Sequence, residues 1–174
     1  MHVATEKLSR AIQIPTVSYS DLSRRDESAF RRWEAFLTEE FPLLHEKLEK
    51  HTPGGLAILF RWEGSDSALL PGALLAHFDV VPPGEPERWK YPPFSGEIAE
   101  GCVWGRGAID DKLSDITILQ AVEELLTEGL VPERTIYLCF GGDEEIGGTE
   151  GAQAIVRWLR SRGERLAWVI DEGG

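Results

Sequence analysis

The stretch GALLAHFDVV, residues 72–81, decides the fold of this chain. It is almost continuously apolar, and such a run suits a β-strand that is covered on both faces of its sheet. Two polar residues, His77 and Asp79, stand near its carboxyl end, and they share one face of an extended strand because side chains alternate. Open α/β sheets bind ligands at the carboxyl ends of their strands. The stretch therefore predicts an α/β fold with a site at that edge.

Helical and strand-like patterns alternate on both sides of this stretch. Apolar residues at helical spacing, and short β-branched or aromatic runs, predict the elements. Helices are expected over residues 3–12, 27–50 (with a break at Pro42), 112–129 and 149–162, and strands over 56–62, 135–140 and 166–170, with a short strand-like segment at 102–104. With 174 residues and no linker, we expect one α/β domain over residues 1–174.

Composition excludes several classes of partner. The chain has 30 Asp and Glu against 18 Lys and Arg, a net charge of -12, which argues against a nucleic-acid partner because phosphates must be neutralised. No apolar run reaches the roughly 18 residues of a membrane span, and the first residues lack the apolar stretch of a signal peptide. We therefore expect a cytoplasmic protein with neither a nucleic-acid nor a membrane partner.

His77 is the first candidate metal ligand. A neutral imidazole is a common zinc ligand, and its second ring nitrogen needs an acceptor that fixes the tautomer. Asp79, on the same face of the strand, can be that acceptor. The alternative is a purely structural histidine at a strand end.

Glu144 and Glu145, in GGDEEIGG (residues 141–148), are the second candidate pair. One carboxylate can bind a metal while its neighbour takes a proton from the attacking water. The alternative is a solvated acidic turn or helix start. The flanking glycines favour the site, because they let the backbone turn tightly and approach a ligand.

Two aspartates complete the candidates. Asp110, in WGRGAIDDK (residues 104–112), is either the N-cap of the next helix or a metal ligand, and Asp111 can take the capping role. Asp171 directly follows the apolar run LAWVI, where a carboxylate costs desolvation energy unless it is paired.

Taken together, these motifs resemble the co-catalytic zinc peptidases and amidohydrolases that include aminoacylase, carnosinase and carboxypeptidase S. The resemblance rests on LLAHFDVVP (74–82), WGRGAIDDK, GGDEEIGG and WVIDEGG (168–174), and AIQIPTVSYS (11–20) and WKYPPFSGEI (89–98) are typical of the carboxypeptidase S and N-acyl-amino-acid hydrolase branch. It implies a zinc-exopeptidase-like catalytic domain with a mixed, mostly parallel sheet flanked by helices. This chain would be its N-terminal part, without the lid or dimerisation domain.

The resemblance also implies a role for each candidate. His77 would bind the first zinc, Asp79 would orient His77, and Asp171 would complete the ligands of that zinc. Glu145 would bind the second zinc, and Asp110 would bridge both metals. Glu144 would be the general base. A histidine for the second zinc is expected from outside this chain.

The implied reaction is hydrolysis of a small peptide or an N-acyl amino acid. Two zinc ions are expected in a complete site and one tight zinc in this chain, and manganese or cobalt also suits carboxylate-rich sites. We expect this chain alone to be weakly active or inactive, and the full-length protein to be a possible homodimer. The alternative function is a non-catalytic metal-binding α/β module.

Overall fold

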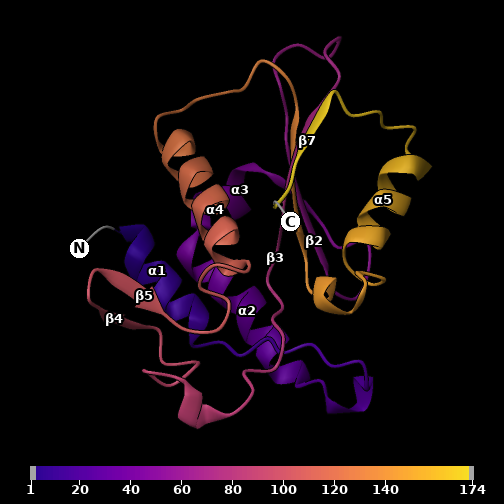
Figure 1. The fold of residues 1–174 in the computed structure, drawn as a ribbon. Coiled ribbons are helices and arrows are strands. Elements are labelled where there is room, and N and C mark those ends of the chain that lie inside the picture. Colours follow the sequence, from indigo (N-terminus) through magenta and orange to yellow (C-terminus); the bar gives the residue numbers. More distant parts are fainter. Residues whose placement is uncertain (1–2, 173–174) are drawn as a thin grey trace.

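A five-stranded sheet, ordered β1-β2-β6-β3-β7, forms the centre of the computed structural model, which describes residues 3–172 (Figure 1). The apolar stretch becomes β3 (Gly72–His77), which is parallel to β6 (Ile136–Gly141) and to β7 (Trp168–Ile170). β2 (Ala57–Trp62) is antiparallel to β6, and β1 (Glu49–His51) is antiparallel to β2. Four strands thus share one direction and β2 opposes them, which confirms the mixed, mostly parallel sheet.

The register brings three carboxyl ends to the same edge of this sheet. His77 at the end of β3 pairs with Gly141 at the end of β6. Ile170, the last residue of β7, pairs with Leu74. The turns that follow β3, β6 and β7 therefore meet, as expected from their sequence.

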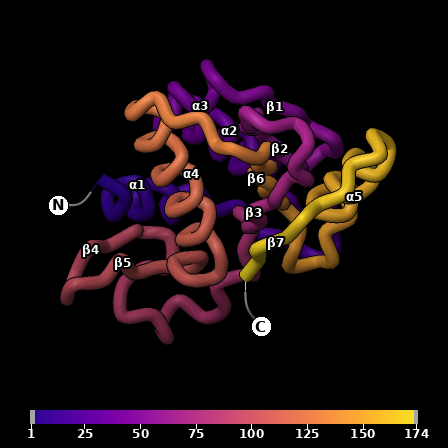
Figure 2. The backbone as a smooth tube through the Cα atoms, turned by 90° about the horizontal axis from the view of Figure 1, so that it is seen from above, coloured from indigo at the N-terminus to yellow at the C-terminus, as the bar shows by residue number. Residues whose placement is uncertain are grey.

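Helices cover both faces of the sheet (Figures 1 and 2). One face packs against four helices, which are α1 (Val3–Ile12), α2 (Glu27–Glu40), α3 (Pro42–Lys47) and α4 (Lys112–Thr127), and the other face packs against α5 (Ala152–Ser161). Three short 3-10 helices are η1 (Leu22–Arg24), η2 (Pro86–Arg88) and η3 (Glu144–Ile146). Among residues 3–172, no helix combines the length and apolar character needed to cross a bilayer.

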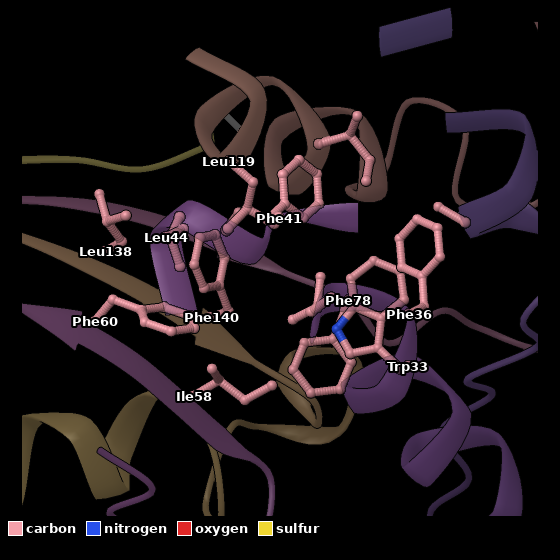
Figure 3. Close-up of a cluster of buried hydrophobic side chains, with 14 of the residues drawn as sticks. Trp33, Phe36, Phe41, Leu44, Ile58, Phe60, Phe78, Leu119, Leu138 and Phe140 are labelled. Atoms are coloured by element: carbon pink, nitrogen blue, oxygen red, sulfur yellow. The ribbon is translucent and has the colours of Figure 1, made fainter. Parts of the chain in front are cut away.

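Alternating side chains of the strands build two cores. In β6, Leu138 and Phe140 join the larger cluster on the side of α1 to α4, while Tyr137 and Cys139 join the smaller cluster under α5. Figure 3 shows part of the larger cluster, which includes the aromatic side chains of Trp33, Phe36, Phe41, Phe60, Phe78 and Phe140. Because both faces of the sheet are buried, its central strands need apolar residues at nearly every position.

Three details differ from the sequence predictions. The helix expected over residues 27–50 breaks before Pro42 as predicted, but it ends at Lys47, and residues 49–51 form β1 because their backbone pairs with β2. β4 (Glu97–Ala99), which was not predicted, pairs with β5 (Cys102–Trp104). β3 itself ends at His77, so Asp79 lies in the turn beyond it. Both unpredicted strands are three residues long, too short for a readable alternation.

Candidate metal centre

His77 faces a group of carboxylates across the edge of the sheet. Its side chain is 4% exposed, and its Nε2 atom lies 3.0 Å from Asp110 Oδ1, 3.3 Å from Glu172 Oε1 and 3.9 Å from Glu144 Oε2. Within residues 3–172, this buried nitrogen nevertheless has no hydrogen-bond partner of acceptable geometry. A buried ring nitrogen that points at several carboxylate oxygens without a hydrogen bond fits a site for a cation.

Asp79 lies beside the other ring nitrogen, and its role as the orienting residue stays a prediction. Nδ1 of His77 lies 3.1 Å from the Asp79 carbonyl oxygen and 3.4 Å from Asp79 Oδ1. Burial lowers the pKa of His77, but Asp79, Glu172 and Asp111 outweigh burial and raise this pKa to about 10. The local field therefore favours positive charge at this position.

Asp79 also connects His77 to the turn after β6. Its carboxylate is fully buried and accepts hydrogen bonds from the backbone N–H groups of Glu144, at 3.0 Å, and Glu145, at 3.3 Å. The turns after β3 and β6 are thereby held together by one side chain.

The turn after β6 is closed by Asp143. This buried carboxylate accepts hydrogen bonds from the N–H groups of Glu150, at 2.7 Å, and Gly151, at 2.8 Å. At Gly142 a side chain has no room, because an added Cβ atom would lie 2.4 Å from Phe78 Cζ. Gly142 therefore packs closely against Phe78, while the approach to a ligand that the glycines favour stays a prediction.

The two glutamates that this turn presents differ in their surroundings. The side chain of Glu144 is 50% exposed and reaches toward His77. Glu145 Oε1 accepts a hydrogen bond from Val81 N at 3.2 Å, and burial together with the charge of Asp110 raises its pKa. Glu144 is thus half exposed to solvent, whereas Glu145 is anchored by a backbone hydrogen bond.

Asp110 and Asp111 occupy the turn before α4. Asp110 is the exposed ligand candidate beside His77 Nε2, with 57% of its side chain accessible. Asp111 takes the N-cap position, but within the described chain its side chain makes no capping hydrogen bond; Oδ2 accepts instead from His77 N at 3.3 Å. Burial raises the pKa of Asp111. Asp111 therefore supports the backbone of His77, a role that the sequence did not predict.

Glu172, rather than Asp171, stands beside His77. Among residues 3–172, the group of at least three potential metal ligands is formed by His77, Asp110 and Glu172, whose ligand atoms lie within 4.8 Å of one another. Asp171 accepts a hydrogen bond from Glu172 N at 3.0 Å, and its charge adds to the burial that raises the pKa of Cys139 to about 12. Asp171 as a metal ligand stays a prediction. Sequence reasoning did not single out Glu172, although a second carboxylate directly after a strand was a visible signal.

The candidate residues line a common pocket. Its volume is about 750 Å³, and its lining includes Asp110, Asp111, Glu144, Glu145, Asp171 and Glu172. Four of the six residues that the sequence nominated, Asp110, Glu144, Glu145 and Asp171, line this pocket. The other two lie behind them: His77 Nε2 is 3.0 Å from Asp110 Oδ1, and Asp79 accepts a hydrogen bond from Glu144 N. Such a concentration of carboxylates around one histidine can hold divalent cations and leave room for a ligand.

Comparison with known proteins identifies similar chains. Residues 73–174 match the family described as Peptidase family M20/M25/M40. The N-fatty-acyl-amino acid synthase/hydrolase PM20D1 of Xenopus tropicalis is 46% identical over 170 residues, covering 97% of this chain and 33% of that protein. Carboxypeptidase S of Saccharomyces cerevisiae is 38% identical, covering 97% of this chain and 31% of that protein. This chain therefore spans about a third of the length of these relatives.

Solved structures share the fold. An M20 family metallo-carboxypeptidase from Sulfolobus solfataricus superposes with a TM-score of 0.77 at 20% identity, covering 100% of this chain and 38% of that one. Human carnosine dipeptidase 1 superposes with a TM-score of 0.72 at 18% identity, covering 98% of this chain and 38% of that one. At these identities the likeness concerns the fold.

Proposed function

Because the chain belongs to peptidase family M20/M25/M40, we propose that it carries the metal-binding and proton-transferring residues of a zinc-dependent hydrolase. The proposed substrates are small peptides or N-acyl amino acids, and the bond that is cleaved is an amide. Relatives named as a carboxypeptidase and as an N-fatty-acyl-amino acid synthase/hydrolase support this substrate class. The observation that carries the proposal is the buried Nε2 atom of His77, which faces Asp110 and Glu172 without a hydrogen bond within the described residues.

The donor set fits one tight zinc ion. His77 and Asp110, with a third carboxylate from Glu172 or Asp171, would supply three protein ligands, and an open fourth position is typical of catalytic zinc. A second ion would have Asp110 and Glu145 as its candidates in this chain. Manganese or cobalt would also suit these oxygen-rich ligands.

The chemistry divides between the metal and Glu144. A bound zinc ion would act as a Lewis acid on the scissile carbonyl and on the attacking water. The half-exposed carboxylate of Glu144, which reaches within 3.9 Å of His77 Nε2, would accept a proton from that water and pass it to the leaving nitrogen. Asp79 would keep Nδ1 of His77 in place, so that Nε2 stays directed at the site.

Zinc titration tests this proposal directly. The purified chain should bind one zinc ion tightly, and His77→Ala should abolish that binding because it removes the single imidazole of the group. Glu97→Gln is the matched control, since this exposed carboxylate on β4 lies outside the pocket and should leave zinc affinity unchanged. Equal zinc affinity in the wild type and in His77→Ala would refute the assignment of the site.

Turnover separates the hydrolase from the alternative of a non-catalytic metal-binding module. Both hypotheses expect zinc binding, but only the hydrolase expects that Glu144→Gln removes activity from a protein that contains the full length of its relatives. The cytoplasmic location and the possible homodimer stay predictions.

A further inference from the structure

Lys112 is a buried lysine close to the candidate metal centre. It begins α4, two residues after Asp110, and its side chain is fully buried. Its Nζ atom donates hydrogen bonds to the carbonyl oxygens of Ala11, at 2.9 Å, and Ile14, and lies 5.0 Å from the centre of the Trp33 ring. A lysine is almost never fully buried without such partners, because burying its charge is costly.

The two carbonyl groups that accept from Lys112 lie where α1 ends. The chain continues from there into a segment that pairs with the turn after β3. Val80 N donates to Thr16 O at 3.0 Å, and Ser18 N donates to Val80 O at 3.0 Å. The Thr16 hydroxyl, also buried, donates to the carbonyl oxygen of Phe78. Residues 16–18 therefore form a brace along residues 78–80, the segment that contains Asp79.

A continuous set of contacts thus links the two sides of the site. On one side, Lys112 continues the turn that carries Asp110. On the other, Asp79 contacts Nδ1 of His77 and accepts from the turn that carries Glu144. The hydrogen bonds from Lys112 to the end of α1 close this set, in addition to the direct hydrogen bond from His77 N to Asp111 Oδ2.

Buried negative charge adds a second reason for a lysine at this position. Asp79 and Asp115 are both fully buried. Burial lowers the pKa of Lys112, and the charges of these two carboxylates raise it against that lowering. Within residues 3–172, both carboxylate oxygens of Asp115 lack a hydrogen-bond partner. An apolar residue at position 112 would remove the amine whose charge interacts with these two buried carboxyl groups.

We propose that Lys112 is a positioning residue of the metal centre, which holds the His77–Asp79 segment at the correct distance from Asp110 through the end of α1 and the brace 16–18. This inference rests on the proposed metal site, and it adds a residue that would bind neither metal nor substrate. Outer contacts that orient metal ligands typically contribute on the order of 10- to 100-fold to metal affinity.

The test compares Lys112→Met and Thr16→Val with Ser9→Ala. Lys112→Met keeps an unbranched side chain that is one atom shorter and removes the hydrogen bonds, and Thr16→Val removes the next contact with little change in volume. Ser9→Ala is the matched control, because it deletes a side-chain hydrogen bond of α1, to Gly96 O at 2.6 Å, that does not lead to the site. Zinc affinity by chelator competition, the cobalt absorption spectrum and amide hydrogen exchange at Val80 are measured for each variant.

We expect about 10-fold or weaker zinc binding, and an altered cobalt spectrum, in Lys112→Met and Thr16→Val but not in Ser9→Ala. Should Lys112→Met fail to fold by circular dichroism, Thr16→Val decides. Wild-type affinity and spectra in the folded variants would overturn the inference. Should the wild type itself bind no zinc, the proposed function fails, and amide exchange at Val80 decides whether Lys112 holds residues 78–80. About 10-fold faster exchange in Lys112→Met and Thr16→Val than in Ser9→Ala supports the brace. Equal exchange in all three variants refutes it.

Discussion

Replacing Glu172 with Gln, in parallel with Asp171→Asn, distinguishes the two carboxylates that could complete the zinc ligands. Both changes remove one negative charge with little change in shape. Glu172 Oε1 lies 3.3 Å from His77 Nε2, whereas the charge of Asp171 acts on Cys139. The structure therefore predicts unequal effects of these two similar substitutions.

The expected magnitudes follow from these positions. Loss of an outer contact already costs about 10- to 100-fold in metal affinity, so loss of a charged ligand in Glu172→Gln should cost ~100-fold or more. That factor corresponds to about 2.8 kcal/mol, at roughly 1.4 kcal/mol per tenfold. A carboxylate that is not a ligand acts on the ion only through space, which contributes ~1 kcal/mol at an illustrative separation of about 8 Å in water, so Asp171→Asn should weaken binding by only about sixfold.

Chelator competition near neutral pH measures both zinc dissociation constants, and circular dichroism shows whether each variant is folded. A large loss in Asp171→Asn with wild-type affinity in Glu172→Gln would refute the placement of Glu172 and support the sequence expectation for Asp171. Wild-type affinity in both variants would show that neither carboxylate is a ligand.

Three further outcomes follow from the site. Glu144→Gln should leave zinc affinity within about twofold of the wild type, because this half-exposed side chain is proposed as a proton carrier and not as a ligand. Activity in a full-length protein should fall by about 10²- to 10⁴-fold. Loss of zinc from the variant would contradict this role. Because the folded-state pKa of His77 is raised from 6.5 to about 10, its stabilising contribution is complete below about pH 6.5 and is lost as the pH rises through about 10. The melting temperature of chelator-treated protein should therefore fall over that range, and less so in His77→Asn; an equal fall in both would exclude His77 as the cause. Gly142→Ala should lower the free energy of unfolding, measured with denaturant, by about 1–3 kcal/mol, because the added Cβ atom would overlap the Phe78 ring. Gly141→Ala is the control: the nearest atom to its Cβ would be 3.4 Å away, so its loss of unfolding free energy should be clearly smaller.

Local patterns predicted most elements because each depends on neighbouring residues. The apolar run of β3 and the helical spacing of α4 need no information from distant parts of the chain. β1 and β4 are short and partly exposed, and they are strands because of their partners across the sheet. Such pairing is a tertiary property, and the sequence does not show it locally.

The sequence by itself determined which residues gather at the site. His77, Asp79 and Glu144 stand at or just after the carboxyl ends of β3 and β6, which parallel pairing brings to one edge, whereas Asp110 stands in the turn before α4. The chemistry of a histidine among carboxylates therefore follows from the residue types and their places at the strand ends.

Only the tertiary structure decided how these residues are held. The last pair between β7 and β3 is Ile170 with Leu74. Asp171 and Glu172 follow this pair and are not part of the β-sheet pairing. The direction in which the chain leaves β7 then places Glu172, rather than Asp171, next to His77. Lys112 gave no signal either, since lysines are mostly exposed, and its burial results from packing between α1 and α4, segments about a hundred residues apart. Residue types and strand ends are local information, whereas ligand choice and support depend on contacts that exist only after the chain has folded.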